Sequence, residues 1–79
     1  MIDVAQIRAA RALLNISQME LATAASVHVA TVRRLEAAAV LRGNVESLAK
    51  IEVALVNLGV EFLPPEPGKG PGVRLRAQL

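Results

Sequence analysis

Apolar residues recur every three or four positions along the first 58 residues of the chain, which predicts helices rather than strands. We expect four helices, over about Val4–Leu14, Ser17–Ala25, Val29–Ala38 and Val45–Leu58. The breaks between them are only a few residues long, and Gly59 supplies a stop after the last helix. Residues 1–59 therefore form one helical unit.

The second helix begins with a capping box, in which the Ser17 hydroxyl accepts from the amide of Glu20 and the Glu20 carboxylate accepts from the amide of Ser17. This short helix is expected to bury Met19 and Ala22, with Leu21 as a further candidate. Because it is so short, packing rather than helix propensity must hold it.

The fourth helix is the longest and the most apolar. We expect its core-facing residues to be Val45, Leu48, Ile51, Leu55 and Leu58, with Asn44 as the N-cap. Its last turns, Val53–Val56, are apolar on more than one side. One side is therefore expected to face the bundle and another side a partner chain.

After Gly59 the pattern changes to a period of two, over Val60–Leu63 and again over Val73–Arg76. All four prolines and three of the five glycines lie between these stretches, in Pro64–Gly72. We predict a β-hairpin with a nine-residue loop, in which Val73 and Leu75 face inward and the two arginines of that strand face outward.

A lone hairpin is marginally stable in water, so this one needs the helices or a second subunit to hold it; the alternative is a disordered tail. We interpret residues 60–79 as a dimerisation element. The apolar residues expected at the dimer contact are Val56, Val60, Phe62, Val73 and Leu75.

Composition limits the classes of function. With 79 residues, 53% of them apolar but only one aromatic, the chain has the size of one small domain with a thin core, which favours self-association. It has no cysteine, which removes disulfides, Cys-ligated zinc and thiol catalysis. Its apolar runs are far shorter than a membrane crossing needs, and the N-terminus does not resemble a signal peptide. We expect a cytoplasmic, nucleoid-associated protein without a membrane contact.

Catalysis is not expected. The sequence has no glycine-rich phosphate loop, no histidine pair at helical spacing and no carboxylate pair in a polar constellation. Its single histidine, His28, has no orienting acid at a suitable spacing. No metal, cofactor or small-molecule effector is implied.

The charge lies unevenly along the chain, whose formal net charge is +2. Residues 1–43 hold five arginines and three acidic residues, whereas the rest of the chain is balanced. This mild basicity permits nucleic acid as a partner without requiring it.

Two short helices joined by a tight turn have the geometry of a helix-turn-helix, in which the second of the pair lies in the major groove of DNA. At about 100° per residue, the helix from Val29 has two separable sides. The side expected to be buried carries Val32, Leu35 and Glu36. The opposite side carries Ala30, Arg33 and Arg34, with Val29 on the border. Arginine suits the groove because its planar fork pairs with both acceptors of guanine, and small apolar side chains can meet thymine methyl groups.

Three pieces in this order, Leu14–Ala22 (LNISQMELA), Ala25–His28 (ASVH) and Thr31–Glu36 (TVRRLE), resemble the Cro and phage-repressor (XRE-like) helix-turn-helix family over about residues 4–58. The resemblance implies a mainly α, four-helix lambda-repressor-like domain, here with a C-terminal β-hairpin. It places base contacts at His28, Val29, Ala30, Arg33 and Arg34. It places contacts to the DNA backbone at Ser17, Gln18, Thr31, Arg42 and Asn44. It also implies an ion pair between Arg11 and Glu36.

The chain departs from the family at three points. Ser26 stands where the family usually has glycine, which implies strain if this residue is left-handed. His28 stands where serine or threonine commonly caps the helix, so a base contact, a phosphate contact and a simple cap are all open. A hairpin replaces the fifth helix with which the family often ends. Its Arg74 and Arg76 are explained equally well by a phosphate contact and by an exposed edge kept soluble by charge.

The resemblance implies a sequence-specific transcriptional regulator, a homodimeric repressor on an inverted-repeat operator in double-stranded DNA, with activation through polymerase as a variant. The alternative is a protein-interaction module, an antitoxin or anti-activator whose tail, Val60–Leu79, binds a partner protein.

Overall fold

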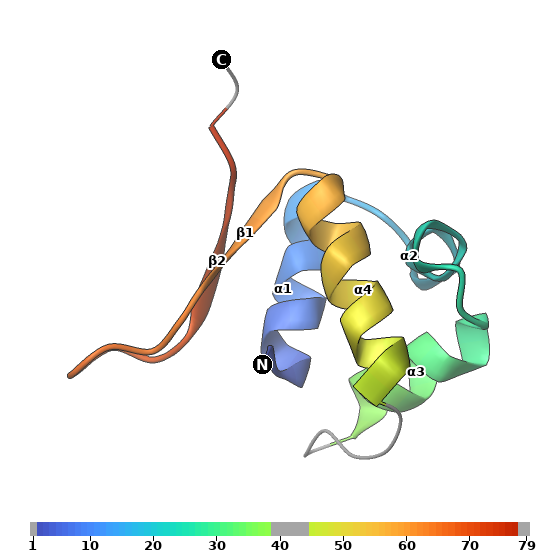
Figure 1. The fold of residues 1–79 in the computed structure, drawn as a ribbon, viewed down its shortest axis with the longest axis horizontal. Helices are drawn as coiled ribbons and strands as arrows, with labels where there is room; N and C mark the ends of the chain where they lie inside the picture. Colours follow the sequence, from blue (N-terminus) through green and yellow to red (C-terminus); the bar gives the residue numbers. More distant parts are fainter. Residues whose placement is uncertain (1, 39–44, 78–79) are drawn as a thin grey trace.

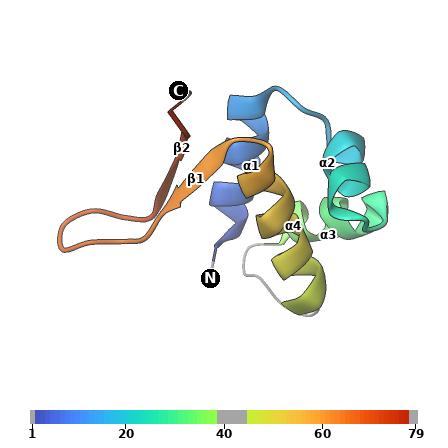
Figure 2. The ribbon, with the colours of Figure 1, turned by 45° about the horizontal axis from the view of Figure 1, so that its top comes forward.

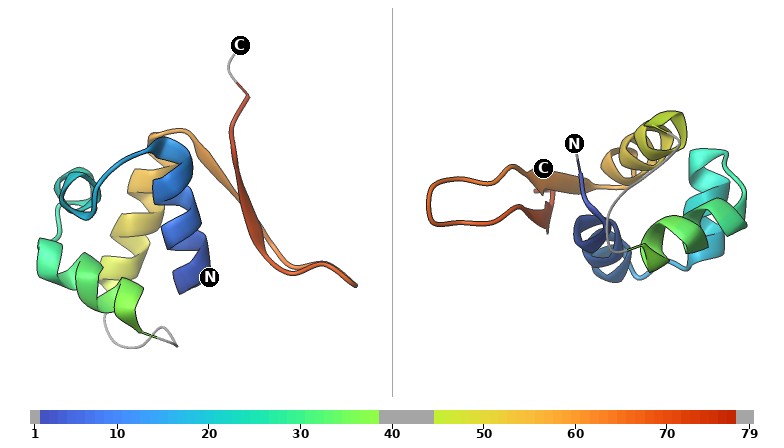
Figure 3. Two further views of the ribbon diagram at one scale, coloured as in Figure 1. Left: turned by 180° about the vertical axis from the view of Figure 1, so that it is seen from behind. Right: turned by 90° about the horizontal axis from the view of Figure 1, so that it is seen from below.

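Four helices and an antiparallel hairpin follow one another along the chain (Figure 1) in a computed structural model that describes residues 2–38 and 45–77. The helices are α1 (Val4–Leu14), α2 (Gln18–Ala25), α3 (Val29–Ala37) and α4 (Val45–Asn57), and the strands are β1 (Val60–Leu63) and β2 (Gly72–Leu75). The predicted four-helix domain with a C-terminal hairpin is thereby confirmed. The helices α1 and α4 lie between the hairpin on one side and α2 with α3 on the other (Figures 1 and 3).

Helix ends are fixed by side-chain caps. The predicted capping box of α2 is present, with both Ser17–Glu20 hydrogen bonds at 3.0 Å. A second box at α1, which sequence reasoning missed, pairs Asp3 with Gln6. The first two helices therefore begin where the sequence predicts.

The core gathers one apolar face from each helix and Val60 from β1, while Val73 of β2 packs against it partly buried. Its most completely enclosed side chains are Ile7, Leu21, Val32, Ile51, Leu55 and Val60. Within the described residues no helix has the length and apolar character needed to cross a membrane.

Three expected core residues prove exposed. Met19 is 55% exposed because it lies about 200° around α2 from the buried Leu21. Val45, the first residue of α4, is 62% exposed, and Leu58, which follows the last residue of α4, is 45% exposed. The sequence periodicity extended the apolar stripe of α4 one turn too far at each end.

The hairpin register pairs Val60 with Leu75 and Phe62 with Val73, on the face that meets the helices. The loop covers residues 64–71, one fewer than expected, because Gly72 already belongs to β2. It extends away from the helices (Figure 2).

The structure corrects two expectations for this hairpin, that Val60 lies at a dimer contact and that Leu75 is covered on the inward face. Val60 is only 1% exposed and is enclosed by the core of its own subunit, so its side chain has no surface to offer at a dimer contact. Leu75 shares the helix-facing side with Val60 but lies beyond the cover of the core and is 52% exposed. Phe62 and Val73 are half-buried against the core, which leaves Leu75 as the exposed apolar residue of β2.

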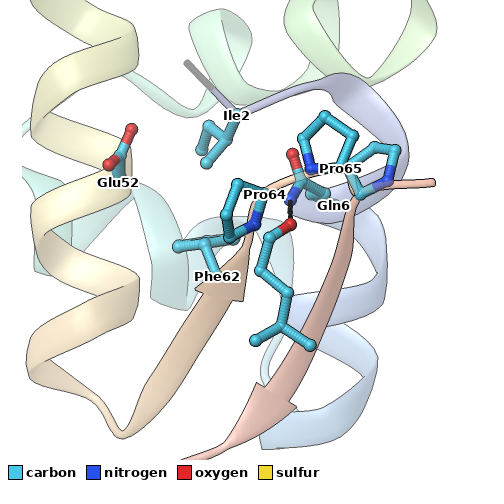
Figure 4. Close-up of a pocket in the computed structure, with 8 residues that line it drawn as sticks. Ile2, Gln6, Glu52, Phe62, Pro64 and Pro65 are labelled. Carbon is cyan, nitrogen blue, oxygen red and sulfur yellow. Dashed lines mark hydrogen bonds between the residues drawn. The ribbon is translucent and has the colours of Figure 1, made fainter. Parts of the chain in front are cut away.

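A buried glutamine fastens the hairpin to α1. The Gln6 side-chain nitrogen donates to the carbonyl of Gly72 at 2.9 Å and to that of Leu63 at 3.4 Å, the second bond being drawn in Figure 4. Its side-chain oxygen accepts from the amide of Asp3 at 2.9 Å. Since Gln6 is 6% exposed and all its bonds are internal, it joins both strands to the helical unit.

Candidate nucleic-acid interface

The junction of α2 and α3 is a tight turn of three residues, Ser26 to His28. Ser26 has φ 56° and ψ 42°, which is the left-handed conformation. The amide of Val27 donates a hydrogen bond to the carbonyl of Ala22 at 3.0 Å. Figure 1 shows α2 along its axis while α3 runs across the picture, so the two helices cross steeply. This is a helix-turn-helix.

The left-handed residue predicts a stabilising substitution. A non-glycine residue in this conformation costs about 1–2 kcal/mol, part of which glycine gives back through its freer unfolded chain. Ser26→Gly should therefore raise the free energy of unfolding by about 0.5–1 kcal/mol in urea denaturation. Asn15→Gly, at the other left-handed position, is the matched control and should gain less because asparagine tolerates this conformation. A loss of stability in Ser26→Gly would contradict the strain assigned to this turn.

The two sides of α3 separate as the sequence predicts. Val32, Leu35 and Glu36 are at most 6% exposed. The exposed side carries Ala30, Arg33, Arg34 and Ala37. Ala37, which sequence reasoning missed, lies two turns after Ala30, and that spacing is the signal that could have found it. Val29 packs half-buried against the core and Thr31 is also half-buried.

The two arginines of α3 form no ion pair with any residue that the structure describes. Within residues 2–38 and 45–77, neither Arg33 nor Arg34 has an ion pair or hydrogen bond from its side chain. By contrast, Lys50, Lys69 and Arg74 each form an ion pair, with Glu46, Glu66 and Glu61 respectively. Arg8 and Arg76 also form no ion pair with any described residue. The exposed side of α3 is therefore a positive surface. Around the circumference of the helix, the small apolar residues Ala30 and Ala37 lie between the two arginines.

His28 occupies the N-cap of α3. Its Nδ1 accepts from the amide of Ala30 at 3.3 Å while the residue stays exposed. Of the three roles left open for this histidine, the cap is the one present in the structure.

An ion pair fixes α3 against α1. The Arg11 guanidinium donates to both carboxylate oxygens of Glu36, at 2.7 and 2.8 Å. Arg11 also donates to the carbonyl of Ile16 at 3.1 Å, and Arg8 donates to the carbonyl of Glu36 at 3.3 Å. The pair that the family resemblance implied is thus present, and it joins α1, the α1–α2 turn and the end of α3.

Gln18 belongs to the same network. Its side-chain nitrogen donates to Glu36 at 3.2 Å, so its amide is directed at the ion pair. The phosphate contact expected of Gln18 stays a prediction. The hydroxyl of Ser17 is engaged in the cap of α2.

The network keeps Glu36 charged despite its burial. Burial alone would raise the pKa of Glu36, but hydrogen bonds from Arg11 and Gln18, with the positive charges of Arg11 and Arg8, lower that pKa on balance. The hydrogen bond to Glu36 in turn raises the pKa of Arg11 above its ordinary value. Both partners are therefore ionised at neutral pH.

Two expected backbone contacts, Arg42 and Asn44, lie outside the described residues. Val56, expected at a dimer contact, is half-buried in α4. Among the described residues no three His, Cys, Asp or Glu side chains cluster in a way that could hold a metal ion.

No model of a known protein family matches this sequence, and no curated protein matches it. The function must be inferred from the residues themselves.

Proposed function

We propose that this protein is a sequence-specific DNA-binding transcriptional regulator that reads DNA with α3 in the major groove. One observation carries the proposal: the exposed side of α3 holds Arg33 and Arg34 without a carboxylate partner among residues 2–38 and 45–77, on a helix fixed in place by the Arg11–Glu36 pair. A single helix fits the major groove, which is about 12 Å wide.

We assign different base contacts to the different exposed residues of α3. Each arginine can donate to both acceptors of a guanine, and Ala30 and Ala37 are small enough to meet thymine methyl groups. To Thr31, which is half-buried, we assign a phosphate contact, with a capping role near the start of α3 as the alternative. The ordered sequence pieces that resemble the Cro and phage-repressor family support the same assignment, and we propose membership of that family on this basis.

We further propose a homodimer that represses by occupying an inverted-repeat operator in the cytoplasmic nucleoid. Two copies of α3 would then meet half-sites about one helical turn, roughly 34 Å, apart. Support for a dimer surface comes from α4, where Val53 is 59% exposed although its neighbours Ala54 and Leu55 are buried. This is the second apolar side that the sequence of α4 predicts.

Selection from random duplex DNA by the purified protein at about 0.15 M salt tests the proposal, because non-specific binding is weak there. We expect enrichment of an inverted repeat with half-site centres about 10–11 base pairs apart. With six phosphates contacted by the dimer, log affinity should fall against log salt with a slope of about −5. A folded protein that enriches no sequence would overturn the DNA-binding proposal, and an enriched single site without a repeat would overturn the dimer alone.

A further inference from the structure

The outer edge of β2 has backbone groups available for another strand. The amide of Arg76 donates to the carbonyl of Gly59 at 2.7 Å, so the alternation of an antiparallel ladder turns the N–H and C=O groups of Val73 and Leu75 away from β1. Within the described part of the chain, no residue bonds to these outward groups. We call this the β2 edge.

A hollow with both apolar and polar lining residues adjoins one end of the β2 edge. Leu58 and Leu75, 45% and 52% exposed, line it together with Leu14, and its volume is about 380 Å³. Strand addition uses two features, an unpaired strand edge and an adjacent pocket. The backbone hydrogen bonds of the edge give affinity, and the pocket holds a side chain of the added strand.

The charges along β2 disfavour a second copy as the added strand. Arg74 and Arg76 point to the side of the sheet opposite Leu75, because side chains alternate along a strand. In an antiparallel pair, opposite residues share a face, so a register centred on Arg74, Leu75 or Arg76 puts an arginine opposite an arginine. Like charges directly opposite destabilise such a pair. The register centred on Val73 avoids this, but it brings Leu75 opposite Pro71, which has no N–H to donate to the ladder.

The same charges favour a strand of the opposite pattern. Within the hairpin, Glu61 of β1 meets Arg74 in an ion pair, while Val60 and Phe62 lie on the helix side. Arg76 has no carboxylate partner among the described residues. An added strand with apolar residues on one side and carboxylates on the other would fill the hollow and neutralise Arg76.

We propose that the β2 edge binds an extended segment of a partner protein in which apolar and acidic residues alternate. The segment forms a third strand beside β2, places an apolar side chain against Leu75 and pairs a carboxylate with Arg76. The hairpin lies across α1 and α4 from α3 (Figures 1 and 3), so this site does not overlap the proposed DNA surface. The inference does not depend on DNA binding.

Binding of fluorescent peptides to the full chain, followed by anisotropy, tests the site. The probe is a seven-residue peptide alternating valine and glutamate, and its controls are the same peptide with lysine for glutamate and a scrambled peptide that breaks the alternation. We expect the acidic alternating peptide to bind at least about tenfold more tightly than either control. Arg76→Glu and Leu75→Ser should each weaken it by about tenfold, whereas Lys69→Glu, the same charge change at the far end of the hairpin, should not.

Equal binding of acidic and basic peptides, or full binding by Arg76→Glu, would overturn the proposal. Sedimentation of Leu75→Ser and of a further variant, Val53→Ser, tests the second copy: a homodimer that dissociates in Leu75→Ser but not in Val53→Ser would show that β2 pairs with itself. That outcome would also overturn the proposal. Melting curves confirm that each variant remains folded.

Discussion

Replacing Arg11 with methionine should lower the free energy of unfolding by about 3 kcal/mol at pH 7, because it leaves the carboxylate of Glu36 charged and buried without its partner. Glu36 is 5% exposed, and methionine offers its carboxylate no hydrogen bond in place of those from the guanidinium. For a domain of this size the loss corresponds to a fall in Tm of roughly 15 °C in thermal denaturation. Methionine keeps much of the volume of the arginine stem, so lost packing contributes little.

Glu36→Gln is the matched control from the other side of the ion pair. It leaves Arg11, whose side chain is 23% exposed, able to reach water and still bonded to the carbonyl of Ile16. We expect a smaller loss, about 1–2 kcal/mol. Equal losses of stability in Arg11→Met and Glu36→Gln would contradict the claim that an unpaired Glu36 costs more than an unpaired Arg11.

The pH dependence of stability tests whether Arg11→Met acts through the charge of Glu36. In the wild type the pKa of Glu36 is lower in the folded than in the unfolded state, so its stabilisation is complete above the unfolded value, about 4.3, and is lost as pH falls through the folded pKa. Arg11→Met removes the hydrogen bond and the positive charge of Arg11, which lower the pKa of Glu36, so we expect this pKa to lie above its wild-type value. Protonation of Glu36 then relieves the unpaired charge. The stability gap between wild type and Arg11→Met should therefore narrow as pH falls from about 7 to about 4. A gap that stays constant would show that Arg11 acts through packing rather than charge.

The elements that could be predicted from sequence are those set by local rules. The capping box at Ser17, the two sides of α3 and the period-two strands follow from residues close together in the chain. Gln6 could not be predicted, because its role depends on carbonyl groups 57 and 66 residues away that only tertiary packing brings near. The burial of Val60 could not be predicted for the same reason. The period-two pattern gives its face of the strand, but whether that face is enclosed depends on where α1 and α4 lie.

The candidate site shows the same division. Which residues α3 exposes follows from its period, and Arg33 and Arg34 were assigned on that ground. The orientation of Gln18 does not follow from it, since the amide is turned toward Glu36 by an ion pair formed between α1 and α3. Its helix and position could be predicted from sequence, but its hydrogen-bond partner could not.

Arg34→Ala should strongly weaken specific DNA binding while leaving the fold intact, since the exposed side chain of Arg34 has no described partner to lose. A bidentate contact between arginine and guanine contributes about 1–3 kcal/mol of discrimination, and a symmetric dimer loses it at both half-sites. Affinity for the selected site should therefore fall by at least about 30-fold, measured by electrophoretic mobility shift at fixed salt. Binding to random DNA should fall much less.

Two further variants distinguish base reading from charge. Lys69→Ala removes the same charge from the tip of the hairpin, across the domain from α3, and should leave affinity for the selected site nearly unchanged. Arg34→Lys keeps the charge but loses the planar fork, so it should lose specificity while the slope of log affinity against log salt is kept. If Arg34→Lys binds the selected site as tightly as the wild type, Arg34 contacts phosphate rather than guanine. If Arg34→Ala loses no more affinity than Lys69→Ala, α3 does not lie in the major groove, because a helix presenting Arg34 to the bases cannot lose that side chain without weakening the specific complex.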